Sequence, residues 1–148
     1  MGKPYILLVE DNADDIDLTQ RAFDKNHIAN DVMVVRDGAA ASDFLFGEGG
    51  MRSRGAPALI LLDLNLPKVS GLELLERIRM HETTRLIPTV ILTSSKQEED
   101  LLRGYRLGVN SYVRKPVDFN EFVDAVRQVG LYWLVLNEGP PPVGGGGM

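Results

Sequence analysis

An acidic residue, Asp63, directly follows an unbroken apolar run at positions 58–62 and precedes Leu64-Asn65-Leu66-Pro67. An apolar run of this length is typical of a strand buried on both faces in a parallel sheet. The asparagine and proline that follow indicate that the chain leaves the sheet there. Ligands bind at this edge of an open α/β sheet, so the carboxylate of Asp63 is a candidate functional group.

Other polar residues also stand where predicted strands end. Because the carboxyl ends of parallel strands share one edge, we expect these side chains to converge in a crevice where the strand order reverses. Each signal alone has an ordinary explanation, such as a solvated turn or a cap, but their coincidence favours a site. The residues are Glu10 and Asp11 after a strand at 5–9, Thr93 at the end of 89–93, and Lys115 after 111–113.

Three carboxylates in one pocket repel one another, and a hard divalent cation would relieve that repulsion. Oxygen ligands suit Mg²⁺, whereas zinc is disfavoured because no His or Cys accompanies the acids. The predicted cofactor is therefore Mg²⁺. Its expected ligands are Glu10, Asp11, Asp63 and the main-chain carbonyl of Asn65.

With a cation bound, Asp63 is a reasonable phosphoryl acceptor, since carboxylates form aspartyl phosphates. Lys115 and Mg²⁺ would offset the charge of the transferring group, and the Thr93 hydroxyl is a candidate hydrogen-bond donor to it. A phosphatase with an aspartyl nucleophile typically carries a general acid two residues later, where this chain has Asn65. Asn65 and Ser95 flank the expected path of an attacking water, so we expect both to tune the phosphoryl lifetime.

Strand and helix patterns alternate along the chain, which predicts an α/β fold. We expect one doubly wound, five-stranded parallel sheet in the flavodoxin-like order 2-1-3-4-5, with helices on both faces. The predicted strands cover 5–9, 32–35, 58–62, 89–93 and 111–113. The predicted helices begin at 12 or 13, cover 39–46, 72–80 and 98–107, and resume near 119. Their expected core residues include Thr19, Phe23, Phe44, Leu45, Leu72, Leu75 and either Ile78 or Arg79.

The segment from Gly47 to Pro57 is Gly-rich and longer than the roughly 2 to 6 residues usual between a helix and a strand. It lacks the G-x-G-x-x-G pattern and follows a helix rather than a strand. We therefore interpret it as a mobile surface loop rather than a phosphate cradle, with its role left open.

The composition is that of an ordinary globular protein, with 44% hydrophobic and 25% charged residues among 148. A net charge of −5 without a basic stripe argues against a nucleic-acid partner. The absence of a signal-peptide pattern and of a long apolar run argues against export and a membrane span, and we expect a cytoplasmic protein. We expect a single domain at 1–138 and a disordered Pro/Gly-rich tail at 139–148.

Four motifs contain the candidate site residues. They are Val9-Glu10-Asp11-Asn12, Leu62-Asp63-Leu64-Asn65-Leu66-Pro67 with Ser70-Gly71, Leu92-Thr93-Ser94, and Tyr112-Val113-Arg114-Lys115-Pro116. These motifs resemble those of the receiver domain of two-component response regulators, and the resemblance covers about 5–129, with the motifs in the right order and spacing.

The resemblance implies a phosphorelay switch rather than an enzyme, with only Mg²⁺-dependent self-phosphorylation and slow self-dephosphorylation. A sensor histidine kinase would phosphorylate Asp63, with Glu10 and Asp11 holding Mg²⁺ and Lys115 pairing with the phosphate. Thr93 matches the conformational hydroxyl, and Tyr112 matches the aromatic residue whose rotamer follows the phosphorylation state.

Without a second domain, the chain is similar to single-domain regulators that act by protein contact. The long loop before 58–62 and the extended C-terminus are similar to regulators paired with bacterial phytochrome kinases. The alternatives are an aspartyl-phosphate-forming phosphatase, a flavodoxin-like cofactor binder and a phosphorylation-independent interaction module. The acids after the first strand would repel a cofactor phosphate, and the intact acid, hydroxyl and lysine set argues against an inactive scaffold.

Apolar residues near the C-terminus recur at alternating spacings of four and three, the seam pattern of paired helices. The stretch 131–136 is apolar on nearly all sides, more than one surface helix needs. We therefore predict a homodimer, or docking on a kinase, through an extended C-terminal helix. The alternative is that these residues fold over the domain's own core. The predicted seam consists of Phe122, Val126, Val129, Trp133 and Leu136.

Overall fold

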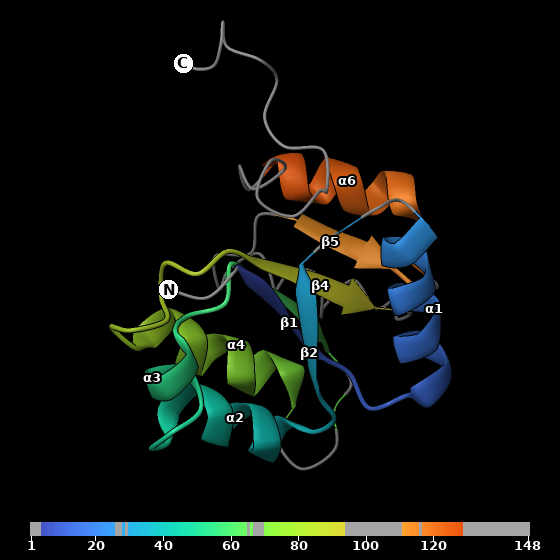
Figure 1. Cartoon of the computed structure of the whole chain (residues 1–148). Helices are drawn as coiled ribbons and strands as arrows, with labels where there is room; N and C mark the ends of the chain where they lie inside the picture. The colour runs from blue at the N-terminus through green and yellow to red at the C-terminus, as the bar shows by residue number, and fades with distance from the viewer. Residues whose placement is uncertain are drawn as a thin grey trace, which may run out of the picture.

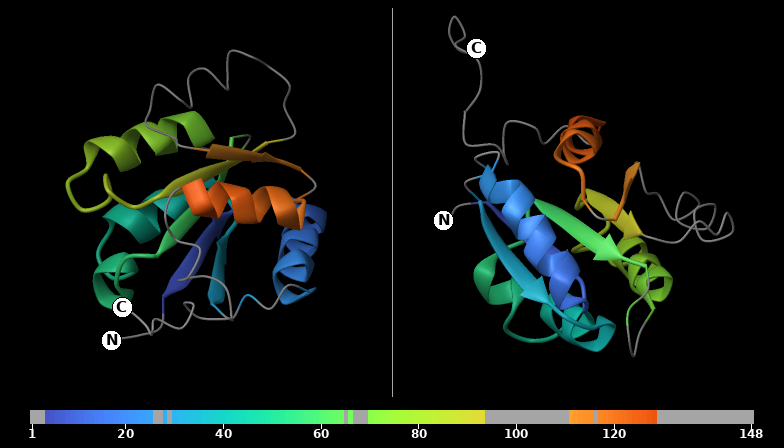
Figure 2. Two further views of the ribbon diagram at one scale, coloured as in Figure 1. Left: turned by 90° about the horizontal axis from the view of Figure 1, so that it is seen from above. Right: turned by 90° about the vertical axis from the view of Figure 1, so that its right-hand side faces the viewer.

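A parallel α/β sheet with a helical layer on each face forms the body of the molecule (Figures 1 and 2). The computed structural model describes residues 4–25, 28, 30–64, 66, 70–93, 111–115 and 117–128. The sheet has five strands in the order β2-β1-β3-β4-β5, all pairs parallel, which confirms the predicted topology.

The described elements follow one another in the predicted alternation. The strands are β1 (Tyr5–Val9), β2 (Asp31–Val35), β3 (Leu59–Asp63), β4 (Thr89–Thr93) and β5 (Ser111–Arg114). The helices are α1 (Ala13–Lys25), α2 (Gly38–Phe46), α3 (Met51–Arg54), α4 (Gly71–Met80) and α6 (Phe119–Gln128). The helix predicted at 98–107 lies outside the described residues.

Two apolar cores lie on opposite faces of the sheet, because alternate side chains of each strand point to opposite faces. Tyr5, Leu7 and Val9 of β1 join the core under α2, α3 and α4, and Ile6 and Leu8 join the core under α1 and α6. Every residue of β1 and β3 is buried, as their unbroken apolar runs predicted. The two buried central strands, β1 and β3, thus end at the same edge of the sheet, at Val9 and Asp63.

The helix cores confirm part of the prediction. Thr19 and Phe23 of α1 and Phe44 and Leu45 of α2 are buried. In α4, the prediction was incomplete: the buried face consists of Leu74, Leu75 and Ile78, with Leu72 only partly buried against it. Arg79 instead donates hydrogen bonds to the carbonyls of Arg85 and Ile87, both at 2.9 Å.

The prediction of a surface loop from Gly47 to Pro57 is only partly right: residues 48, 49 and 52–56 are exposed, but the segment is not a loop throughout. It contains the short helix α3, whose first residue, Met51, is buried in the core beside α2. Arg54 stacks over the Tyr5 ring at 4.5 Å, and the Tyr5 hydroxyl donates to the Gly55 carbonyl. The glycines concealed this packing, because they indicate turns without showing what the residues between them contact.

Helix α6 corrects part of the predicted dimer seam. Phe122 and Val126 are both 0% exposed and pack in the core under α6. The Phe122 ring meets the Phe23 ring with centroids 4.7 Å apart. These two positions therefore belong to the domain's own core, as the alternative interpretation proposed. Val129, Trp133 and Leu136 lie outside the described residues, and their part of the seam stays a prediction.

Among the described helices, none combines the length and the apolar character that a membrane crossing requires.

Candidate functional site

Glu10 and Asp11 follow β1 at the carboxyl edge of the sheet. Glu10 is fully buried, whereas Asp11 is exposed. The Glu10 amide donates to the Val35 carbonyl at 3.0 Å, and Glu10 Oε2 accepts a hydrogen bond from the Asn12 amide at 3.2 Å. These bonds continue the sheet past the end of β1 and fix the Glu10 carboxylate under the edge.

Asp63 is the last residue of β3 and is only 2% exposed. In the sheet register it pairs with Leu92 of β4, and the following Leu64 amide donates to the Leu92 carbonyl at 3.3 Å. This pairing holds the Asp63 backbone in the sheet while its side chain reaches the crevice. The position predicted from the apolar run is confirmed.

Gly71, the first residue of α4, lies against the backbone of the same strand end. A Cβ at this position would stand 2.3 Å from the Asp63 carbonyl oxygen and 2.5 Å from Leu64 Cα. Its amide donates to the Leu64 carbonyl at 3.1 Å, and Ser70 caps the helix by accepting from the Glu73 amide at 3.1 Å. Only glycine allows α4 to begin this close to Asp63.

Lys115 follows β5, and its side chain is 8% exposed. Its ammonium nitrogen lies 2.8 Å from Glu10 Oε1, 2.9 Å from Asp15 Oδ2 and 3.2 Å from Asp63 Oδ2. A lysine ammonium has three hydrogen-bond donors, so three carboxylates match its capacity. The structure thus brings together Glu10, Asp63 and Lys115 as predicted.

Asp15 is a member of this group that the sequence reasoning missed. The sequence pattern explains it by the acidic first turn of α1 alone, where negative charge suits the helix N-terminus. Its place was nevertheless indicated, because α1 begins two residues after Asp11, and its first turn must lie beside the same sheet edge.

Burial and crowding of charge change the acid–base properties of the pocket. Burial raises the pKa of Glu10 to about 7, with a smaller rise from the Asp63 charge, and the Lys115 hydrogen bond opposes the shift. Burial acts to lower the pKa of Lys115, but its contacts with Glu10, Asp15 and Asp63 outweigh that effect and raise it. Lys115 therefore stays protonated at neutral pH. The negative charge of Glu10, in contrast, destabilises the folded protein because it is buried.

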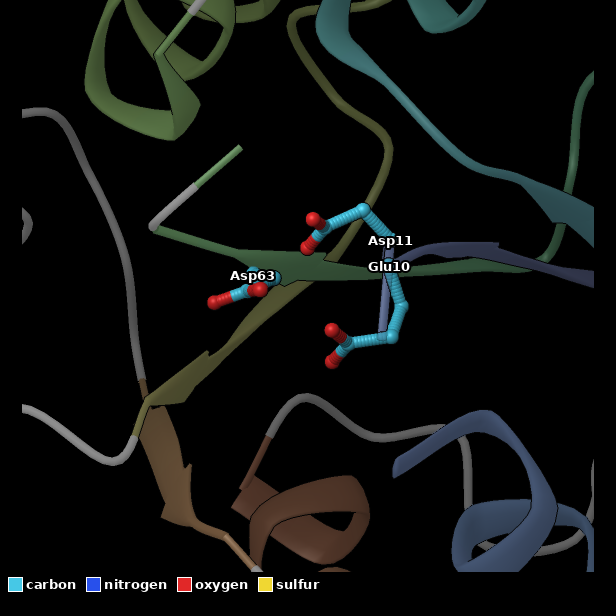
Figure 3. A group of neighbouring side chains, drawn as sticks. All are labelled: Glu10, Asp11 and Asp63. Atoms are coloured by element: carbon cyan, nitrogen blue, oxygen red, sulfur yellow. The ribbon is translucent and has the colours of Figure 1, made fainter. Parts of the chain in front are cut away.

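The acids fit a hard divalent cation. Carboxylate oxygens of Glu10, Asp11 and Asp63 lie within 4.8 Å of one another, and these are the oxygen ligands that Mg²⁺ or Mn²⁺ prefers. Figure 3 shows the three carboxylates extending from the ends of β1 and β3 around a common space. Buried Glu10 Oε1 pairs with the Lys115 ammonium at 2.8 Å, and a carboxylate oxygen keeps a further lone pair for a metal ion.

The other predicted site residues lie at the same edge or outside the described part of the chain. Thr93 ends β4 and pairs in register with Arg114 of β5, next to the pair formed by Asp63 and Leu92. Tyr112 lies opposite Ile91 and packs, partly buried, against the core on the α4 face. Asn65 and Ser95 are outside the described residues.

The fold and the pocket define a class of protein: a doubly wound domain with an acid cluster and a lysine at its topological switch point. Residues 6–127 match the family of response regulator receiver domains, and the chain belongs to that family.

Two sequence relatives extend over most of the chain. It is 45% identical to the probable methanogenesis regulatory protein FilR2 of Methanothrix harundinacea, over 93% of this chain and 88% of that protein. It is 39% identical to the response regulator Rcp1 of Synechocystis, over 87% of this chain and 88% of that protein.

Solved structures of bacteriophytochrome response regulators are similar in fold and sequence. AtBRR has a TM-score of 0.81 and 48% identity, with 93% of this chain and 100% of that chain covered. RtBRR has a TM-score of 0.80 and 54% identity, with 95% and 86% covered. The Mn²⁺-bound form of Rcp1 has a TM-score of 0.73 and 37% identity, with 93% and 99% covered. The chain is thus a receiver domain related to phytochrome response regulators.

Proposed function

We propose that this protein is a phosphorylation switch in a two-component pathway and that Asp63 accepts the phosphoryl group. The observation that supports this most directly is the position of Asp63: a buried carboxylate at a strand end, beside the acids Glu10 and Asp11 and 3.2 Å from the Lys115 ammonium. A carboxylate in this setting is a nucleophile whose product is flanked by a cation.

In the proposed reaction, an Asp63 carboxylate oxygen attacks the phosphorus atom of a phosphohistidine. An O–P bond forms, the N–P bond breaks, and the imidazole nitrogen keeps the bonding electron pair. The Asp63 carboxylate becomes an acyl phosphate, so its own negative charge moves onto the phosphoryl oxygens. Lys115 then pairs with one of these oxygens in place of the carboxylate oxygen.

A Mg²⁺ ion held by Glu10, Asp11, Asp63 and the Asn65 carbonyl would supply neutralisation of the phosphoryl charge. Glu10 and Asp11 would contribute carboxylate ligands to this ion at the carboxyl edge of the sheet. A solved relative, Rcp1, is described in a Mn²⁺-bound form, and the same oxygen ligand set suits that ion.

The switch would run through Thr93 and Tyr112. Thr93 ends β4, the strand next to that of Asp63, and we expect its hydroxyl to donate to a phosphoryl group on Asp63. Tyr112 lies in the neighbouring strand, β5, where a shift of the end of β4 can change its rotamer. Phosphorylation would bias this pair of states only by its differential interaction with them.

We infer that the phosphodonor is a sensor histidine kinase and, more narrowly, a bacterial phytochrome. The support for the narrower partner is that AtBRR and RtBRR, at 48% and 54% identity, are bacteriophytochrome response regulators. A phosphatase role has less support, because the residue two positions after the nucleophile is Asn65, which supplies no general acid.

Incubation with Mg²⁺ and acetyl phosphate tests the proposal without the kinase. We expect a base-labile phosphoryl adduct on the wild-type protein and none on Asp63→Asn. Replacement of Mg²⁺ by EDTA should abolish the adduct. An undiminished adduct on Asp63→Asn, or none on the folded wild type, would refute the phosphoacceptor role.

A further inference from the structure

Lys115 is held by one carboxylate that stands outside the acid cluster. Asp15 Oδ2 lies 2.9 Å from the lysine Nζ, closer than Asp63 Oδ2 at 3.2 Å. Among the described residues, the acids close enough together to share a metal ion are Glu10, Asp11 and Asp63, and Asp15 is not one of them. The pair Asp15–Lys115 therefore differs in kind from the other two contacts of the lysine.

The difference matters because the other two partners change during the proposed reaction. Glu10 and Asp63 would both ligate a divalent ion, and phosphorylation would convert the Asp63 carboxylate to an acyl phosphate. Asp15 undergoes neither change. Of the three carboxylates around Lys115, Asp15 alone is neither a candidate metal ligand nor the proposed phosphoacceptor.

Asp15 is itself fixed by the start of α1. Its amide donates to Asn12 Oδ1 at 3.0 Å, and its carbonyl accepts from Thr19 Oγ1 at 2.7 Å. Thr19 is buried, so the first turn of the helix is anchored in the domain. A lysine side chain has four rotatable bonds and loses conformational entropy when it is held in one rotamer. If Asp15 already holds Lys115 in the free protein, this loss does not have to occur when the phosphoryl group binds.

We propose that Asp15 is a positioning residue for phosphoryl transfer. It holds the Lys115 ammonium at the pocket, within reach of Asp63, so that the cation is already in place when the phosphoryl group arrives. This inference rests on the proposed function, since Lys115 has that duty only if Asp63 accepts phosphoryl groups.

A double-mutant cycle separates this role from a general effect on folding. The four proteins are the wild type, Asp15→Ala, Lys115→Met and the double variant, and Asp14→Ala is the matched control because Asp14 is an exposed acid on the same turn. Urea unfolding in EDTA gives the first readout. If the pair exists, the double variant loses less stability than the two single losses combined.

The rate of adduct formation with acetyl phosphate and Mg²⁺ gives the second readout. We expect Asp15→Ala to slow phosphorylation about three- to tenfold in the wild-type background, and less than about twofold in the Lys115→Met background. Asp15→Asn, which keeps an oxygen acceptor for Lys115, should recover part of the rate. Asp14→Ala should match the wild type.

Equal slowing by Asp15→Ala in both backgrounds would overturn the inference, because the residue would then act without Lys115. Identical rates for Asp15→Ala and Asp14→Ala would overturn it too. In both cases the wild type still forms its adduct, and the proposed function survives. Absence of an adduct on the wild type, with the coupling in EDTA intact, would instead refute the proposed function and leave the pair a structural contact.

Discussion

At the scale of single residues, the pocket is defined by an excess of acid over base. Glu10, Asp15 and Asp63 surround one lysine, with Asp11 at the exposed rim. The cost falls most heavily on Glu10, whose pKa burial raises to about 7. A buried carboxylate near other carboxylates destabilises the free protein. A bound cation offsets this charge repulsion, so the site favours cation binding.

Glu10→Gln tests this balance. At pH 8 we expect the variant to be more stable than the wild type by about 1 to 2 kcal/mol in EDTA, because a neutral amide replaces a buried anion. The gain should be absent below the ordinary pKa of a carboxyl near 4.5, where Glu10 is neutral in both states. It should grow between about 4.5 and 7, and stay constant above about 7, where Glu10 is ionised in both states.

Urea unfolding with and without Mg²⁺ measures both parts of this prediction. Mg²⁺ should stabilise the wild type far more than Glu10→Gln. The control for a general effect of charge is Asp14→Asn, because Asp14 is an exposed acid. A Gln variant that is less stable in EDTA and gains as much from Mg²⁺ as the wild type would contradict the role of Glu10.

At the scale of elements, the position of Asp63 depends on where α4 begins. The helix starts at Gly71 in contact with the Asp63 carbonyl, so the strand end and the helix start form one packed unit. The short helix α3 packs on the same face of the sheet as α4, and its residue Met51 is buried in the core beside α2.

Gly71→Ala should disturb the site through the backbone. The added Cβ would overlap the Asp63 carbonyl and Leu64, and we expect a loss of about 1 to 3 kcal/mol together with slower phosphorylation of Asp63. Glu76→Ala, at an exposed position of α4, is the control. Chemical denaturation and adduct rates measure the two effects, and a variant that equals the control in both would show that the contact is not tight.

Met51→Ala distinguishes a packed segment from a surface loop. We expect a loss of about 2 kcal/mol in the free energy of unfolding, since a buried methionine leaves a cavity. The neighbouring exposed Arg52→Ala should change little. Equal, small effects in urea unfolding would restore the loop interpretation of Gly47 to Pro57.

These elements also show what the sequence can reveal. The apolar runs at 5–9 and 58–62 predicted buried strands, and the residues after them predicted the pocket, because strand burial and strand ends are local signals. The contact of Gly71 with Asp63, eight residues earlier, and the burial of Met51 depend on three-dimensional packing, which no local sequence signal shows. Asp15 is an intermediate case. Its acidic side chain is evident from the sequence, but its partner Lys115 is 100 residues away and could not be predicted from local signals.

At the scale of the whole molecule, the sheet order followed from the alternation of strands and helices, whereas the C-terminal seam was misjudged in part. Spacings of four and three describe any helix with one buried stripe, whether it packs on a partner or on its own sheet. Phe122 and Val126 face the sheet of their own domain. The remaining part of the predicted seam, Val129, Trp133 and Leu136, lies outside the described residues and stays a prediction.

Phe122→Ala should consequently act on folding. We expect a loss of about 3 to 5 kcal/mol, because the ring is fully buried against Phe23. Asn120→Ala, exposed on the same helix, is the control. Denaturation and light scattering together decide the matter: near-normal stability with an altered oligomeric state would place Phe122 in an interface after all.

Phosphorylation of Asp63 is the step on which the proposed function depends. The most direct measurement is to phosphorylate the protein with Mg²⁺ and acetyl phosphate, reduce the acyl phosphate with borohydride, and locate the reduced residue by peptide mass spectrometry. We expect modification of Asp63 alone, with Glu10 and Asp11 unmodified. Modification of another acid, or of none in the folded protein, would contradict it.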